Sequence, residues 1–237
     1  MAVTVRIPTT MRPLSGGAST IGVAPGTLSD VIAELEQRGY DGAFSAEINN
    51  DPFFPLVLAA EHSKNIGLTT SISVAFARNP MTLANLAWDL NQYSKGRFTV
   101  GLGSQIKPHI TRRFSMPWSK PAARMREFIQ AMQAIWRCWE TGEKLDFNGE
   151  FYRHNLMTPM FTPTRKTYGA PGVNLAAVGP LMTEVAAEVA NGVIAHGCWA
   201  AVSPEAAEMA MVVGDRAQRR GVGRRLARVL LRDMADA

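Results

Sequence analysis

The stretch SKGRFTVGLGS, residues 94–104, decides the predicted fold. Its middle, Phe98 to Leu102, has the short apolar and β-branched pattern that predicts a strand. The preceding segment, Met81–Tyr93, carries leucines and alanines at helical spacing, and the following segment, Pro121–Trp139, carries a longer apolar stripe. A strand enclosed by two helices is the repeating unit of a parallel sheet.

The same alternation continues on both sides of this stretch. Asn148-Gly149 between strand-like residues predicts a hairpin over Lys144–Tyr152. Thr27 and Asp30 are suited to begin a helix that Gly39 ends. Further strands are expected at Val3–Ile7, Thr20–Val23, Ala43–Ala46, Ile66–Phe76, Leu175–Val178, Gly192–His196 and Glu208–Val213. Further helices are expected at Pro52–His62, Met182–Ala190 and Gly221–Met234.

This order of elements predicts βαβ units and therefore a parallel sheet in an α/β fold. We count about seven strand–helix units, which suits a parallel (β/α) barrel related to the TIM barrel. Such a barrel typically needs about 250 residues, so we expect a single α/β domain over residues 1–237. An open sheet, an incomplete barrel and a closed barrel of seven or eight strands all fit the pattern.

Composition and charge narrow the class of protein. Of the 237 residues, 46% are hydrophobic and 19% are charged, as in ordinary globular chains. The net charge is +5, and seven arginines lie between Arg216 and Arg232. Because no aromatic residues are interleaved with these arginines, nucleic-acid binding is the weakest interpretation, and we expect no nucleic-acid partner.

The sequence carries no sign of a metal site, a membrane span or a secretory signal. Cys138 and Cys198 lie far apart and form no CxxC pair, which argues against a disulfide framework and against zinc. No run reaches the roughly 18 apolar residues of a membrane span. The first ten residues lack the apolar core of a signal peptide. We therefore expect a soluble, cytoplasmic protein without a metal.

Three stretches in the middle of the chain carry a family resemblance. They are GYDGAFSAE (residues 39–47), TSISVAFARNP (residues 70–80) and the opening stretch at residues 94–104, followed by LAAVGP (residues 175–180) and ANGVIAHG (residues 190–197). In this order they resemble the luciferase-like monooxygenase superfamily, and within it the class that uses the deazaflavin coenzyme F420. The resemblance covers residues 39–197. It implies a TIM-barrel-related oxidoreductase that transfers hydride to or from a small-molecule substrate, often as a homodimer.

The resemblance also implies where the cofactor binds. Such proteins often have a cis peptide under the cofactor ring, which maps to the Ser73–Val74 bond. Gly101 and Gly103 would let the backbone approach a ring or a phosphate, and Gly179 precedes a helix whose free N–H groups could hold the phosphate. Flavin mononucleotide is the alternative cofactor. The implied binding residues are Glu47, Ser73, Val74, Ala75, Gly101, Gly103, Ser104, Val178, Gly179 and Pro180.

The resemblance implies the catalytic residues only in part, because one of them is missing. Many members place an acid–histidine pair after the second strand, whereas Ile48 follows Glu47 in this chain. The remaining polar candidates near the strand ends are Asn49, Gln105 and His109. His109 could act as a proton donor or could be an ordinary surface histidine.

Both ends of the chain resemble other families. Residues 1–38 resemble the start of ubiquitin-like sulfur carriers, although the chain lacks their terminal Gly-Gly. Residues 205–237 resemble the acyl-CoA segment of GNAT acetyltransferases, with a loop that would hold the pyrophosphate of acetyl-CoA: Gln218, Arg219, Arg220, Gly221, Val222, Gly223 and Arg224.

These likenesses suggest a mosaic chain, and the strand–helix piece at each end could replace a missing barrel unit. The alternatives to an oxidoreductase are therefore an acetyltransferase-like acyl-CoA-binding protein and a folded scaffold without catalysis.

Overall fold

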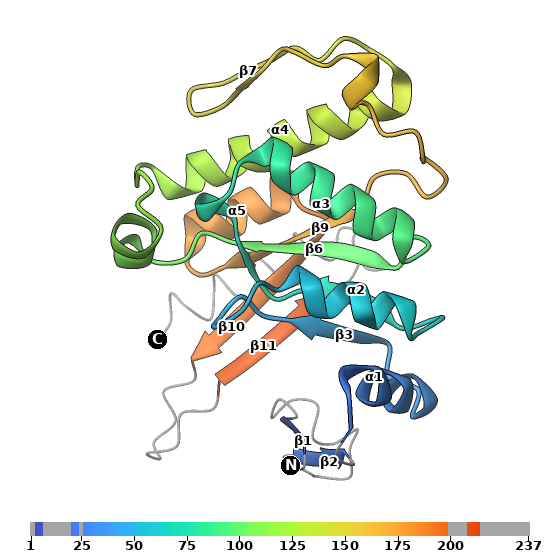
Figure 1. The fold of residues 1–237 in the computed structure, drawn as a ribbon. Helices are drawn as coiled ribbons and strands as arrows, with labels where there is room; N and C mark the ends of the chain where they lie inside the picture. Colours follow the sequence, from blue (N-terminus) through green and yellow to red (C-terminus); the bar gives the residue numbers. More distant parts are fainter. Residues whose placement is uncertain (1–2, 7–19, 24–25, 199–207, 214–237) are drawn as a thin grey trace.

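The computed structural model describes residues 3–6, 20–23, 26–198 and 208–213 (Figure 1). The strands are β1 (Val3–Arg6), β2 (Thr20–Val23), β3 (Gly42–Ser45), β4 (Gly67–Thr70), β5 (Ser73–Val74), β6 (Phe98–Gly103), β7 (Phe147–Asn148), β8 (Arg153–His154), β9 (Gly172–Ala177), β10 (Gly192–Cys198) and β11 (Glu208–Val213). The helices are α1 (Leu28–Gln37), α2 (Phe53–Glu61), α3 (Pro80–Tyr93), α4 (Pro121–Thr141) and α5 (Pro180–Val189), with short helical turns η2 (Ala75–Ala77), η3 (His109–Arg113) and η4 (Pro159–Phe161).

The main sheet has seven strands, in the order β11-β10-β9-β6-β4-β3, with β5 paired to β6. All neighbouring strands from β3 to β10 run parallel, as predicted. The strands β3, β4, β6 and β9 each lead into a helix, and each helix from α1 to α5 packs against the next. The helices thus form a continuous layer along the sheet, which is the arrangement of a (β/α) barrel wall.

The helix boundaries follow the local signals in the sequence. Thr27 and Asp30 form a capping box at the start of α1, where the Thr27 N–H donates to the Asp30 carboxylate at 2.7 Å. After α1, Gly39 adopts a left-handed φ of 79°, as the predicted stop requires. The Asn79 side chain accepts the Met81 N–H at 2.8 Å and caps α3.

The core lies between the sheet and helices α3 and α4. Trp88 of α3 and Trp139 of α4 are fully buried and meet edge-to-face, with ring centroids 5.5 Å apart. The apolar stripe of α4 is core, as predicted, and Trp136 donates its indole N–H to the Ala84 carbonyl at 3.1 Å. Val100 and Leu102 of β6 are fully buried beneath these helices. Burial of this much aromatic surface is a dominant source of stability.

The two ends of the chain differ from the predicted barrel units. β1 and β2 pair with each other in a separate antiparallel sheet, so the proposed replacement of a barrel unit by the N-terminal segment is wrong. β11 joins the main sheet but runs antiparallel to β10, unlike a barrel strand. No pairing joins β3 to β11 in the described ranges, which leaves the sheet open there. The predicted helix at Gly221–Met234 lies outside the described residues.

The predicted hairpin at Asn148-Gly149 is present as the antiparallel pair β7 and β8. Its tip is fastened to α4 by one carboxylate. Glu127 accepts the backbone N–H groups of Glu150, Phe151 and Tyr152 at 2.9, 2.7 and 2.6 Å. The hairpin is therefore held in place by tertiary contacts as well as by its turn.

His154 of β8 makes the stability depend on pH. Its Nε2 is buried without a hydrogen-bond partner in the described part of the chain, and burial lowers the pKa of the imidazole. The unfolded chain therefore binds the proton more readily, so stability is full above about pH 6.5 and declines as the pH falls below it. We expect His154→Gln to reduce this loss of stability at low pH, measured as the free energy of unfolding in urea between pH 5 and pH 8. The same loss of stability in the variant would contradict this assignment.

In the described part of the chain, no helix is both long enough and apolar enough to cross a membrane.

Candidate functional site

The predicted site residues follow the carboxyl ends of parallel strands, which lie at one edge of the sheet. β3 leads into residues 46–51, β4 and β5 into residues 71–79, β6 into residues 104–116, and β9 into residues 178–180. Because parallel strands present their carboxyl ends together, these loops meet there. This edge is where β/α proteins bind their ligands.

Glu47, at the end of β3, forms a buried ion pair with Arg78. The guanidinium Nη2 of Arg78 donates to the Glu47 carboxylate at 3.1 Å and to Asp51 at 2.8 Å. Only 9% of the Glu47 side chain is exposed. Burial alone would lower the pKa of Arg78, but the hydrogen bonds and charges of Asp51 and Glu47 outweigh it and raise that pKa, so the guanidinium stays charged.

The same carboxylate also holds strand β5. Glu47 accepts the Val74 N–H at 2.9 Å and the Ser73 hydroxyl at 3.3 Å. The predicted residues Glu47, Ser73 and Val74 are therefore brought together, and the adjoining Ala75 is fully buried. Glu47 thus has a positioning role, because its carboxylate accepts hydrogen bonds from β5 and from Arg78.

The cis peptide lies between Ser71 and Ile72, so its predicted place at Ser73–Val74 is wrong. The bond falls where β4 has ended and β5 has not yet begun. The two flanking peptides bind the end of β3: the Ser71 N–H donates to Ser45 at 2.8 Å, and the Ile72 carbonyl accepts the Glu47 N–H at 3.1 Å. The geometry is set by contacts with a neighbouring strand, which sequence spacing does not reveal.

Gly101 and Gly103 allow a close approach of the chain, but the group that approaches them is the segment Thr70–Ile72 and not a ligand. A Cβ on Gly101 would stand 1.8 Å from the Thr70 carbonyl oxygen, and the Thr70 hydroxyl donates to the Gly101 carbonyl at 2.7 Å. A Cβ on Gly103 would meet the side chain of Ile72 at 2.7 Å. At these two positions the space is taken by protein atoms.

The loop after β6 holds the predicted residues Ser104, Gln105 and His109. Gln105 has a left-handed φ of 58°, and its side-chain oxygen accepts the Ile106 N–H at 3.1 Å. The Ser104 hydroxyl donates to the Gln105 carbonyl at 3.2 Å. His109 is exposed and begins η3, a single turn of π-helix, a form often found at functional sites.

The end of η3 spans back toward the end of β3. Arg113 donates to the Ile48 carbonyl at 3.2 Å, which links the loop after β6 to the residue beside the predicted Asn49. Asn49 itself is exposed. These contacts place Asn49 and the His109 turn at the same edge of the sheet.

Val178, Gly179 and Pro180 form the start of α5. Gly179 has a φ of 84°, and its Cβ position faces open space, with no atom within 4 Å. The Thr183 hydroxyl donates to the Gly179 carbonyl at 3.0 Å and fixes this turn. Val178 is 72% exposed, so an apolar side chain stands beside the free helix start.

Sequence reasoning missed Arg78 and Asp51, although both lie in or next to the motifs. The sequence does show charged residues directly after two neighbouring strands. Which of these residues form ion pairs, however, depends on the register of the strands. It also missed the exposed apolar side chains that follow the strand ends at this edge, Ile48, Ile106, Val178 and Leu181. The described residues contain no group of three or more His, Cys, Asp or Glu side chains placed to hold a metal ion.

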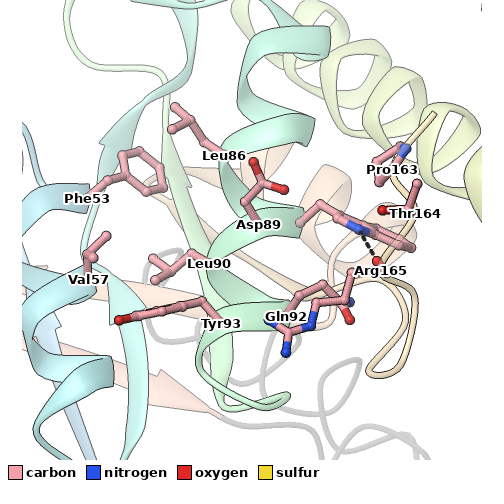
Figure 2. A pocket seen from close by; sticks show the side chains of 11 residues that line it. Phe53, Val57, Leu86, Asp89, Leu90, Gln92, Tyr93, Pro163, Thr164 and Arg165 are labelled. Carbon is pink, nitrogen blue, oxygen red and sulfur yellow. Dashed lines mark hydrogen bonds between the residues drawn. The ribbon is translucent and has the colours of Figure 1, made fainter. Parts of the chain in front are cut away.

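The acyl-CoA loop, Gln218 to Arg224, lies outside the described residues. A pocket of about 490 Å³ lies elsewhere, on the outer side of α3 between α2 and residues 163–165 (Figure 2). It contains none of the residues predicted for the cofactor.

A parallel sheet with such loops at its carboxyl edge defines the β/α class of proteins, which bind their ligands at the strand ends. The chain belongs to the luciferase-like monooxygenase family, whose model matches residues 1–232. Its fold is accordingly the TIM-barrel type of that family. Because the match includes both ends, the sulfur-carrier and acetyltransferase resemblances gain no support, and neither does the mosaic.

Individual relatives agree with this assignment. The uncharacterized protein Rv1360 of Mycobacterium tuberculosis is 54% identical over 187 residues, which cover 76% of this chain and 55% of that protein. An F420-dependent glucose-6-phosphate dehydrogenase of Intrasporangium calvum is 28% identical over 193 residues, covering 75% and 55%. The crystal structure of the monooxygenase RslO1 from Streptomyces bottropensis matches with a TM-score of 0.59 at 25% identity, covering 70% and 52%. The chain thus spans about half the length of these relatives.

Proposed function

We propose that this chain binds coenzyme F420 at the carboxyl edge of its sheet and serves in hydride transfer to or from a small organic substrate. The family membership supports a redox role, and the relative named as F420-dependent supports this cofactor. When bound, the deazaflavin ring supplies the hydride chemistry, while the protein supplies binding, orientation and a proton.

The observation that carries the proposal is the start of α5. The N–H groups in the first turn of a helix have no partner within the helix, and they attract anions. Here the turn begins at a glycine whose Cβ position is open, and its first turn contains no acidic residue. A phosphate of the cofactor would meet free N–H groups here, with no acidic side chain in the first turn to repel it.

The exposed apolar side chains at this edge suit the body of the cofactor. Ile48, Ile106 and Val178 expose their side chains at the same edge, and exposed apolar groups of this kind often mark ligand sites. Glu47, paired with Arg78, also accepts the Val74 N–H and so fixes β5 at the same edge.

We assign the role of proton donor to His109, in the loop after β6. His109 is exposed, and its ring makes no hydrogen bond to other described residues. Imidazole exchanges protons near neutral pH, which suits a donor. Gln105 and Asn49 offer amide groups that would orient the substrate.

Gly179→Val is expected to lower the affinity for F420 at least tenfold, because the side chain fills the phosphate position and strains the left-handed backbone. The measurement is a fluorescence titration of F420 into the purified protein. Gly142→Val is the matched control, since Gly142 has a φ of 77° and open space at the far end of α4. Equal affinities in both variants would refute the phosphate assignment.

A further inference from the structure

The pocket on the outer side of α3 is separate from the strand ends. Its volume is about 490 Å³, within the range of about 300–1,000 Å³ typical of small-molecule sites. Figure 2 shows α3 forming the floor, with Phe53 and Val57 of α2 on one side and Pro163 and Thr164 on the other. The walls are thus two helices and one loop, and most of the lining is apolar.

The loop wall is fastened to α3 by buried groups. The Trp88 indole N–H donates to the Arg165 carbonyl at 3.0 Å. Buried Asn91 and Gln92 both donate to the Gly169 carbonyl, at 3.0 and 2.9 Å. These bonds join segments more than 70 residues apart in the sequence, so the fold itself holds the loop wall against α3.

Two opposite charges line this pocket, on residues that are also exposed to solvent. Neither the Asp89 carboxylate nor the Arg165 guanidinium forms an ion pair or hydrogen bond within the described residues, although both line the pocket. In Figure 2, Asp89 stands between the two walls, whereas the Arg165 side chain runs beside Gln92 toward Tyr93. Burial raises the pKa of the Asp89 carboxyl, and no cation offsets this rise. The carboxylate would therefore gain from a bound ammonium group.

We propose that this pocket binds a small apolar zwitterion, an amino acid or dipeptide with an aromatic or branched side chain. Its ammonium group pairs with Asp89, its carboxylate pairs with Arg165, and its side chain lies against Phe53, Leu90 and Tyr93. The site does not depend on the cofactor proposed above, because it lies on the helical layer and shares no residue with the strand ends.

The test is calorimetric titration of phenylalanine into the full chain, beside two analogues. N-acetylphenylalanine lacks the ammonium group, and 2-phenylethylamine lacks the carboxylate. A hydrogen bond to a charged group contributes about 1.5–3 kcal/mol, so phenylalanine should bind roughly 10- to 100-fold more tightly than either analogue. Asp89→Asn should remove the preference over N-acetylphenylalanine only, and Arg165→Gln the preference over 2-phenylethylamine only.

The matched controls are Glu143→Gln and Arg137→Gln, two exposed charges outside the pocket, which should bind like the unchanged protein. Circular dichroism melts establish that each variant is folded. Three results would overturn the proposal: no binding of phenylalanine, equal affinities for the three compounds, or unchanged preferences in the Asp89 and Arg165 variants.

Discussion

Gly101→Ala is expected to destabilise the folded protein by at least about 3 kcal/mol, at or above the upper end for overpacked cores. The new Cβ would stand 1.8 Å from the Thr70 carbonyl oxygen, which is backbone and part of the parallel sheet. Relief requires β4 and β6 to separate, and this would break the two hydrogen bonds between Thr70 and Gly101. Urea unfolding followed by circular dichroism gives the free energy of unfolding.

Gly42→Ala is the control for this variant. Gly42 also lies in the parallel sheet, in β3, but its added Cβ would be 3.4 Å from the nearest atom, an ordinary contact. We expect a change of less than about 1 kcal/mol there. If the two variants were equally stable, the close approach at Gly101 would not constrain the sheet, and the packing of β4 on β6 described above would be wrong.

Arg78→Met is expected to cost about 3–5 kcal/mol, because it leaves the buried Glu47 carboxylate without its cation. Two carboxylates, Glu47 and Asp51, lose their partner at once. The aliphatic replacement keeps much of the packing volume near Phe53, whose ring centre is 5.3 Å from the guanidinium carbon. The free energy of unfolding again measures the effect.

The exposed ion pair of Arg38 with Glu34 supplies the control. Arg38→Met should cost less than about 1 kcal/mol, as surface pairs do. The double variant Glu47→Gln with Arg78→Met should be more stable than the sum of the two single changes predicts, because the unpaired charge is then absent. A small effect of Arg78→Met alone would mean that water or the hydrogen bonds from β5 are enough to compensate the Glu47 carboxylate in the native protein.

Much of the fold could be predicted because its signals are local. Helical periodicity gave α3 and α4 almost to the residue, and the capping pair Thr27 and Asp30 located the start of α1. The alternation of strands and helices was enough to predict a parallel sheet, since such strands require crossover connections. These features depend on residues that are near one another in the sequence.

The features that sequence reasoning missed depend on register between distant segments. Whether Arg78 pairs with Glu47 is decided by how β3, β4 and β5 align, and the position of the cis peptide follows from the same alignment. The antiparallel direction of β11 could not be predicted either, because the pattern of a short apolar strand is compatible with parallel and with antiparallel pairing. The pocket on the outer side of α3, which Asp89 lines, forms where a loop 77 residues away packs against this helix.

The most direct test of the central claim is thermal melting of the purified chain with and without F420, with flavin mononucleotide and acetyl-CoA as comparison ligands. A ligand at about 100 times its dissociation constant adds roughly 2.7 kcal/mol of stability, a readable rise in Tm. The account predicts a rise with F420 that is at most about half as large in Gly179→Val at the same F420 concentration, and no rise with acetyl-CoA. A cooperative unfolding transition whose Tm does not change on adding F420 would contradict it.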